Sequence, residues 1–384
     1  MPQDPTASSG AVVIGGGAIG LAVAWRAAQR GHAVCVLERG ELGAGTSRVA
    51  AGMLAPVTEA DAGERALLEL GLRSARLWPA FADELAKVSG ADPGLRRCGA
   101  LVVARDGDEA AALERELALR LDLGLDVERL LPSAARRLEP ALAPTLRLAL
   151  AVPGDHAADP RALVLALTEA ARRAGARLRT GATVQAIRVD HGRVTGVELA
   201  GGELVQAGQV VVAAGAWSGA IAGLPDAARI PLRPVKGQIV RLRDRQGPGL
   251  LERIVRFEGG YLVPRGDGRY VLGATMEERG FDTTVTAGGL YELLRDAGEL
   301  VPGIHELVVE EAAAGLRPAT PDNAPVLGAG GEVDGLVWAT GHHRNGILLA
   351  PVTADIVADA LDGAAAPRLF SPGRFVGTRE GVPA

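Results

Sequence analysis

The chain has 384 residues, 48% of them hydrophobic, and a formal net charge of −5. That length and composition predict a large core shared between two domains. We expect no nucleic-acid or membrane partner, because there is no run of like charges and no stretch long and apolar enough to span a bilayer. Cys35 and Cys98 are the only cysteines, which predicts no disulfide framework, no metal site and a reducing, cytoplasmic location.

The first elements of the chain are a short strand over 11–14, a glycine-rich turn, a helix over 21–30 and a second strand over 33–37. Gly15 permits the tight turn, Gly17 lets a pyrophosphate approach the backbone, and Gly20 lets the helix pack closely on the sheet. The free N–H groups at the start of the helix face the phosphates. This unit predicts a bound adenine dinucleotide.

Glu38 follows the second strand, about 20 residues after the glycines, where a carboxylate can accept the ribose hydroxyls. An acid at this position argues against a 2′-phosphate, although Arg39 is its neighbour. Both NAD and FAD satisfy this unit, and a purely structural strand–turn–helix is the alternative.

A segment of small residues over 43–53 comes next, where backbone can lie against a flat or charged ligand. Helices are predicted over 64–89, 108–121 and 160–174, the last with Asp159 as its N-cap. Alternating segments over 183–189 and 193–199 predict a hairpin, and 209–213 predicts a buried strand.

From about Pro231 the pattern changes to strands, over 238–242, 254–257, 261–264, 270–274 and 308–316, with a helix over 290–300. Strands over 325–327 and 336–339 and a helix over 345–361 complete the pattern. Nucleotide-type segments thus occur at the start, middle and end. We therefore predict a mixed α/β fold, with a Rossmann-like cofactor domain (1–85, 150–225 and 305–384) and an inserted antiparallel-sheet substrate domain (86–149 and 226–304).

The segment from Trp338 to Ile347 repeats the strand–glycine–helix geometry, with a new helix predicted to begin near Asn345. A nicotinamide enzyme has no need of a second helix start in its cofactor domain. A flavin enzyme has a use for one, because reduction at N5 leaves negative charge at N1 and the C2 carbonyl, which helix N–H groups stabilise. Beside the first motif, this one favours FAD over an ordinary crossover.

Two basic residues stand out in the strand-rich region. Arg317 ends an apolar strand before a proline, and a guanidinium held there can grip a carboxylate, although on composition alone a surface salt bridge is the simpler explanation. Lys87 and Lys236 are the only lysines, and Lys236 is most simply explained as a surface loop residue.

A hairpin is predicted over 257–276. A four-residue loop at 265–268 would pair Tyr261 with Leu272 and place Tyr261, Ala274 and Met276 on one face. That face is either the floor of a small pocket or part of a core.

Taken together, these segments resemble the glycine oxidases, the thiamine-pathway branch of the D-amino-acid oxidase family of flavoproteins. The matching segments are 11–17, 50–54, 234–237, 261–265, 273–276, 314–318 and 341–351. The glycine turn is generic to dinucleotide-binding proteins, whereas the segments around Arg317 and Arg344 are far more specific.

The resemblance implies that Arg317 binds the substrate carboxylate with help from the Tyr261 hydroxyl, and that Met53, Met276 and Arg344 border the pocket. Where the best-known glycine oxidase has a histidine two residues before the tyrosine, this chain has Gly259, which leaves the substrate range open. The expected contacts of a non-covalent FAD are Gly15, Gly17, Ala18, Ile19, Gly20, Glu38, Arg39, Thr46, Ser47, Ala51, Gly52, Met53, Val184, His342, His343, Arg344, Asn345, Gly346, Ile347 and Leu348.

The implied reaction is hydride transfer from the Cα of glycine, sarcosine, D-alanine or D-proline to flavin N5. The substrate amine must be neutral, so activity should rise with pH, and no side-chain base is required. His342 and His343 are then expected to pack beside the flavin. The imine hydrolyses to the keto acid (glyoxylate from glycine) and ammonia, or feeds thiazole synthesis for thiamine, while O₂ reoxidises the flavin and gives hydrogen peroxide.

Two alternatives stay open: a D-amino-acid or sarcosine oxidase or dehydrogenase with another electron acceptor, and a non-catalytic flavin-binding scaffold. The C-terminal half has no cysteine, which excludes a cysteinyl-flavin there. The resemblance also suggests a homotetramer.

Overall fold

A six-stranded sheet organises one part of the computed structural model, which describes residues 10–375. All its neighbouring strands are parallel except β19, which runs antiparallel to β20. This is the Rossmann-like sheet that the glycine turn predicts. Its strands in spatial order are β19 (Val326–Ala329), β20 (Leu336–Thr340), β13 (Gln209–Val212), β1 (Ala11–Ile14), β2 (Val34–Leu37) and β9 (Arg177–Arg179).

Helices cover one face of this sheet and a small sheet covers the other. The helices are α1 (Ala18–Gln29), α3 (Arg65–Ser89), α6 (Pro160–Arg173) and α8 (Ala350–Leu361), packed around Trp25, Trp78 and Phe81. The opposite layer is β10 (Val184–Asp190), β11 (Arg193–Leu199) and β12 (Leu204–Gln206). The predicted hairpin over 183–199 is confirmed, as is Asp159 as the N-cap of α6, where its side chain accepts from Arg161 N.

The second large sheet has eight strands and is antiparallel except for the β15–β5 pair. Helices α5 (Pro132–Leu138) and α7 (Ala287–Leu300) pack on one face, and α4 (Gly107–Asp122) on the other. The strands in spatial order are β18 (Val308–Ala319), β14 (Arg233–Arg243), β17 (Arg269–Gly273), β16 (Gly260–Pro264), β15 (Ile254–Phe257), β5 (Ala100–Ala104), β7 (Leu148–Val152) and β6 (Glu128–Leu130).

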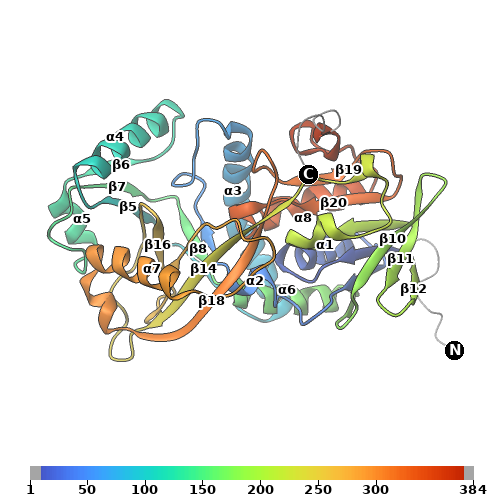
Figure 1. Ribbon diagram of the computed structural model, residues 1–384, viewed down its shortest axis with the longest axis horizontal. Helices are drawn as coiled ribbons and strands as arrows, with labels where there is room; N and C mark the ends of the chain where they lie inside the picture. The colour runs from blue at the N-terminus through green and yellow to red at the C-terminus, as the bar shows by residue number, and fades with distance from the viewer. Residues whose placement is uncertain (1–9, 376–384) are drawn as a thin grey trace.

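Figure 1 shows the two large sheets at opposite ends of the long axis, with the long strands β14 and β18 reaching toward α1 and α8. A short sheet of β3 (Met53–Leu54), β8 (His156–Ala158) and β4 (Leu95–Arg96) and the one-turn helix α2 (Thr46–Val49) complete the fold. The division into two domains at the stated boundaries stays a prediction, and the outer ends of its ranges 1–85 and 305–384 lie outside the described residues.

The helix predicted to begin near Asn345 begins later. A 3₁₀ turn occupies His343–Asn345, and α8 starts at Ala350. Proline suits the first turn of a helix, where its missing N–H costs no hydrogen bond, and Pro351 stands at that point of α8. A helix from Asn345 would have placed this proline in its interior.

Three other local predictions were wrong. Tyr261 pairs with Gly273 rather than Leu272, because Arg265 N donates to Arg269 O (2.8 Å), which shifts the pairing of the two strands by one residue. Arg317 lies inside β18, which is an edge strand and so tolerates the following proline. Lys236 lies inside β14, with its side chain 1% exposed, and is not a surface loop residue.

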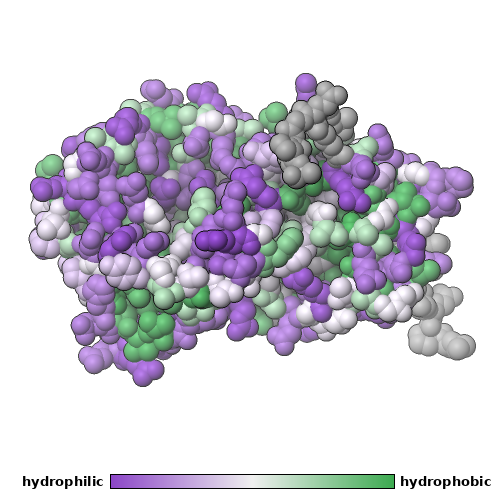
Figure 2. All heavy atoms as spheres, viewed as in Figure 1, coloured by the Kyte–Doolittle hydropathy of each residue, from purple (hydrophilic) through white to green (hydrophobic). Residues whose placement is uncertain are grey.

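On the face in Figure 2, hydrophilic side chains predominate and apolar residues form smaller groups between them. Within residues 10–375, no helix has the length and apolar character needed to cross a membrane. The same residues contain no cluster of His, Cys, Asp or Glu that could hold a metal ion.

Candidate active site

Gly15 and Gly20 of the first turn are required by their surroundings, whereas Gly17 faces open space. Gly15 has φ +107°, and a Cβ there would lie 2.5 Å from Ala213 O. A Cβ on Gly20 would lie 1.9 Å from Gly15 O, so this glycine lets α1 pack against the end of β1. A Cβ on Gly17 would meet only Ser47 Oγ, at 3.2 Å, and would otherwise project into open space. The turn is therefore built for close packing behind and close approach of a ligand in front.

Polar groups at the end of β2 shape the edge of this turn. The Glu38 carboxylate accepts from Gly16 N (2.7 Å) and Gly40 N (2.9 Å), which fixes its orientation. Ser47 Oγ accepts from Ala18 N (3.0 Å) at the first residue of α1. The Arg39 guanidinium lies 3.8 Å from the ring centroid of Trp217, which stacks in turn on Phe281.

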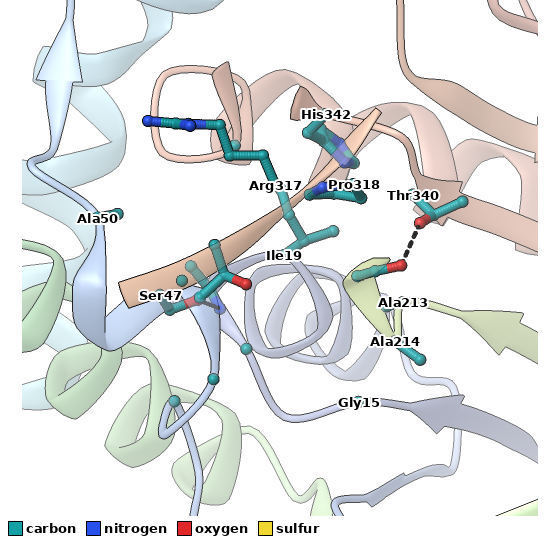
Figure 3. Close-up of a pocket in the computed structure, with 18 of the residues that line it drawn as sticks. Gly15, Ile19, Ser47, Ala50, Ala213, Ala214, Arg317, Pro318, Thr340 and His342 are labelled. Atoms are coloured by element: carbon teal, nitrogen blue, oxygen red, sulfur yellow. Dashed lines mark hydrogen bonds between the residues drawn. The ribbon is translucent and has the colours of Figure 1, made fainter. Parts of the chain in front are cut away.

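A cavity of about 520 Å³ runs from the glycine turn to Arg317. In Figure 3 the Arg317 side chain extends away from Gly15, so the two mark opposite ends of the site. The expected cofactor contacts that line this cavity are Gly15, Gly17, Ala18, Ile19, Glu38, Arg39, Thr46, Ser47, Ala51, Gly52, Met53, Val184, His342, His343, Arg344, Asn345, Gly346 and Ile347.

Three expected site residues lie elsewhere. Gly20 lies behind the turn, against Gly15. Leu348 faces α3, where its carbonyl accepts from Ser74 Oγ (2.6 Å) and Trp78 Nε1 (2.9 Å). Met276 lines a second, adjoining cavity and is 61% exposed.

The histidines of the 342–347 loop are neutral near pH 7. Burial lowers the pKa of His342 to about 3, and its Nε2 pairs with Thr353 Oγ1 (3.0 Å). Burial, followed by the charges of Arg344 and Arg317, lowers the pKa of His343 to about 3 as well. Neither imidazole is then basic enough to take a proton from a substrate amine at neutral pH.

The residues of the cavity fit an FAD. The ligand-facing side of Gly17 is open, and the start of α1 points at the space beside it. At the other end of the cavity, His343 Nε2 is buried and has no hydrogen-bond partner, which is a polar atom left for a ligand. Backbone of the 342–347 loop lies in the same wall.

Of the residues that the structure describes, four line both cavities: Glu59, Tyr261, Arg317 and Arg344. Arg317 Nη1 donates to Thr275 O (3.1 Å) and Lys236 O (3.4 Å), and among the described residues no carboxylate forms an ion pair with it. Burial raises the pKa of Tyr261, so its phenol stays protonated and can donate. An unpaired guanidinium beside a phenol donor is an arrangement that binds a carboxylate.

Glu59 was not predicted. Its carboxylate joins two guanidinium groups, with Arg256 Nε at 3.1 Å and Arg344 Nε at 3.1 Å. In the sequence it is one of several acids between a small-residue segment and a helix, a pattern typical of a solvated turn. Its role depends on Arg256, which is far away along the chain, and so no local signal reveals it.

The comparisons with known proteins agree with this geometry. The family profile described as FAD dependent oxidoreductase (DAO) matches residues 11–360. The glycine oxidase of Geobacillus kaustophilus is 38% identical over 91% of this chain and 92% of its own length. Its crystal structure superposes with a TM-score of 0.88, at 37% identity over 96% of this chain and 99% of that one.

Two further relatives are a longer, bifunctional protein and an oxidase named for another substrate. The bifunctional protein ThiO/ThiG of Trichormus variabilis is 36% identical over 91% of this chain, which spans about half (52%) of that relative's length. The structure of iminodiacetate oxidase from Chelativorans has a TM-score of 0.85, at 31% identity over 94% of this chain and 98% of that one. Fold, cavity and sequence lead to one conclusion: the chain belongs to the DAO family of FAD-dependent oxidoreductases.

Proposed function

We propose that this FAD-dependent amino-acid oxidase acts on glycine and on other small amines such as sarcosine, D-alanine and D-proline. Arg317 carries the proposal. It is the guanidinium at the junction of the two cavities whose hydrogen-bond partners are backbone carbonyls, and so its charge is available to a substrate carboxylate. The proposed products are the imine and its hydrolysis products, glyoxylate and ammonia when glycine is the substrate, with hydrogen peroxide formed from O₂.

In the proposed reaction, bound FAD supplies the hydride acceptor. Arg317 and the Tyr261 hydroxyl hold the carboxylate and so orient the substrate Cα–H toward the cofactor cavity. The buried, neutral histidines of the 342–347 loop remove no proton. The substrate must therefore arrive with a neutral amine, and we expect kcat/KM to rise with pH up to the pKa of that amine.

A wider substrate range is favoured by Gly259. A Cβ at this position would meet only Asp296 Oδ2, at 3.8 Å, so the outer wall of the second cavity is open there. Arg256 also lines that cavity. The likeness to iminodiacetate oxidase supports N-carboxymethyl amines as a second class of substrate.

The proposal includes delivery of the glycine-derived imine to thiazole formation for thiamine, in the cytoplasm and by a homotetramer. The bifunctional ThiO/ThiG relatives support the thiamine connection. The location and the oligomeric state rest on the family resemblance.

The deciding experiment is anaerobic mixing of the purified flavoprotein with glycine, sarcosine, D-alanine, D-proline and iminodiacetate. We expect glycine to bleach the flavin absorbance, and admission of air to restore it with formation of peroxide. Bleaching followed by reoxidation only with a quinone or dye would indicate a dehydrogenase. A flavin that none of these amines bleaches would contradict the proposal and favour a scaffold.

A further inference from the structure

Lys236 is a buried cation that the proposed reaction does not use. Its side chain is 1% exposed within β14, and its Nζ lies 3.1 Å from Asp282 Oδ2 and 3.6 Å from Glu277 Oε2. Burying an ammonium group costs free energy unless opposite charges compensate it. Both compensating carboxylates come from one segment, residues 274–286, which joins β17 to α7 and is called the strap below.

Hydrogen bonds hold the strap against β14, next to Arg317. Backbone bonds join Lys236 and Glu277 in both directions, at 2.8 and 3.0 Å. Beside them, the buried Gln238 amide donates to Glu277 Oε1 (2.7 Å) and accepts from Thr286 N (2.8 Å). Near its middle, Phe281 of the strap stacks on Trp217 in the wall of the cofactor cavity.

Arg317 depends on this fastened pair of segments. Its guanidinium donates to Thr275 O of the strap and to Lys236 O of β14. It lies across Gly237, where a Cβ would come within 2.4 Å of its Nη2. The distance between these two carbonyl oxygens depends on how closely the strap packs against β14. The position of the Arg317 guanidinium therefore depends on that packing.

We propose that Lys236 is a positioning residue for Arg317: its buried ammonium group holds the strap on β14, and the strap's Thr275 carbonyl in turn aims the guanidinium. This inference rests on the proposed role of Arg317 in carboxylate binding. Lys236 holds the strap at two points. One is Glu277, which follows Thr275 closely, and the other is Asp282, near the middle of the segment. Hydrogen bonds from Thr284, and then from Lys236, hold the pKa of Asp282 at about 2, so this anchor stays ionised.

The test measures carboxylate binding without turnover. The flavin-loaded protein is titrated with glycolate, which lacks the amine to be oxidised, and the change in flavin absorbance gives Kd. We expect Lys236→Met to raise Kd about tenfold and KM for glycine by a similar factor, with kcat changed less than threefold. Asp282→Asn, which removes one anchor and keeps the lysine, should raise Kd about threefold.

The matched control is Lys87→Met, because Lys87 is the other lysine and is exposed near the end of α3. It should leave Kd unchanged. Hydrogen exchange supplies a second readout, since Lys236→Met should speed exchange of the strap amides Glu277 and Thr286 without affecting those of β1. If Lys236→Met does not fold, Asp282→Asn and Lys236→Arg carry the test, and Lys236→Arg should recover part of the affinity by retaining the charge.

The outcomes separate the two proposals. Variants at Lys236 or Asp282 that retain flavin and bind glycolate as the wild type does would overturn the positioning role alone. A wild-type protein that binds no small carboxylate would overturn the role of Arg317 and the proposed function with it.

Discussion

Arg317 and Glu59 show at the residue scale how charge is distributed where the two cavities meet. Glu59 already engages two guanidinium groups, those of Arg256 and Arg344, whereas Arg317 pairs with no carboxylate among residues 10–375 and bonds to the carbonyls of Lys236 and Thr275. A substrate carboxylate entering the junction therefore finds one cation without a competing anion. The arginine segment was conspicuous in the sequence, but its lack of an acidic partner is a property of the folded chain.

Replacing Arg317 should mainly affect substrate binding. A charge-assisted hydrogen-bonded pair contributes about 1.5–3 kcal/mol, so Arg317→Ala should raise KM for glycine roughly 10- to 150-fold. Steady-state peroxide formation measures this change. Arg295→Ala, on the exposed side of α7, should leave KM as it is, and an unchanged KM in Arg317→Ala would remove Arg317 from the site.

Replacing Glu59 should change which substrates are accepted. Glu59→Gln leaves Arg256 and Arg344 without their shared carboxylate, so a second substrate carboxylate can pair with them. We expect kcat/KM for iminodiacetate relative to glycine to rise roughly tenfold, equivalent to about 1.4 kcal/mol. Glu64→Gln is the control, since Glu64 lies 4.0 Å from Arg344 and accepts from Asn323 Nδ2. Equal ratios in both variants would contradict the expectation.

At the element scale, periodicity located most helices and strands, while their ends and registers depended on single contacts. Helix α1 starts at Ala18 because the glycine turn leads directly into it, whereas the pattern placed its start after Gly20. The start of α8 was predictable in principle, since Pro351 belongs in a first turn. The register of Tyr261 was not, because it depends on one backbone bond, Arg265 N to Arg269 O, that the loop sequence does not specify.

The packing of α1 on β1 gives a prediction about cofactor binding. A methyl group on Gly20 would lie 1.9 Å from Gly15 O, so Gly20→Ala must push the start of α1 away from the sheet. We expect this variant to lose most of its bound FAD, measured as the flavin-to-protein absorbance ratio after purification. Gly107→Ala, whose Cβ would meet nothing within 4 Å, should retain the wild-type ratio. Full retention by Gly20→Ala would show that the turn can relax.

At the scale of the whole molecule, the site is assembled from segments that are distant in the sequence, and this limits what the sequence reveals. The cavity residues come from β1, the 43–53 segment, β10, β18 and the 342–347 loop. Motifs and family resemblance identify such segments one by one. Motifs and family resemblance do not reveal the roles of Glu59 and the buried Lys236, because each role depends on partner residues on other elements.

The stability of the whole fold should depend on pH through the buried histidines. The pKa of His343 is lowered to about 3 in the folded state, so between about pH 6.5 and 3 the unfolded chain binds a proton that the folded chain does not. The contribution of His343 to the free energy of unfolding is therefore fully present above about pH 6.5, and it decreases as the pH falls. His343→Asn keeps a residue that tolerates φ +45° and removes this titration.

Melting temperatures at pH 7 and pH 5 measure the effect. We expect the wild type to lose more of its Tm than His343→Asn does. Asp155 acts in the opposite direction, because burial raises its pKa to about 6, but it is common to both proteins and cancels in the comparison. Parallel pH profiles would show that His343 is protonated in the folded state as well.

The strand order of the six-stranded sheet has a consequence for biosynthesis. β20 is the neighbour of β13, and the cavity wall extends to Ile347, so a ribosome must synthesise both before the cavity can close. Until then β13 is an open parallel edge that other chains can pair with. We therefore expect the complete cofactor cavity to form only after most of the chain has been translated.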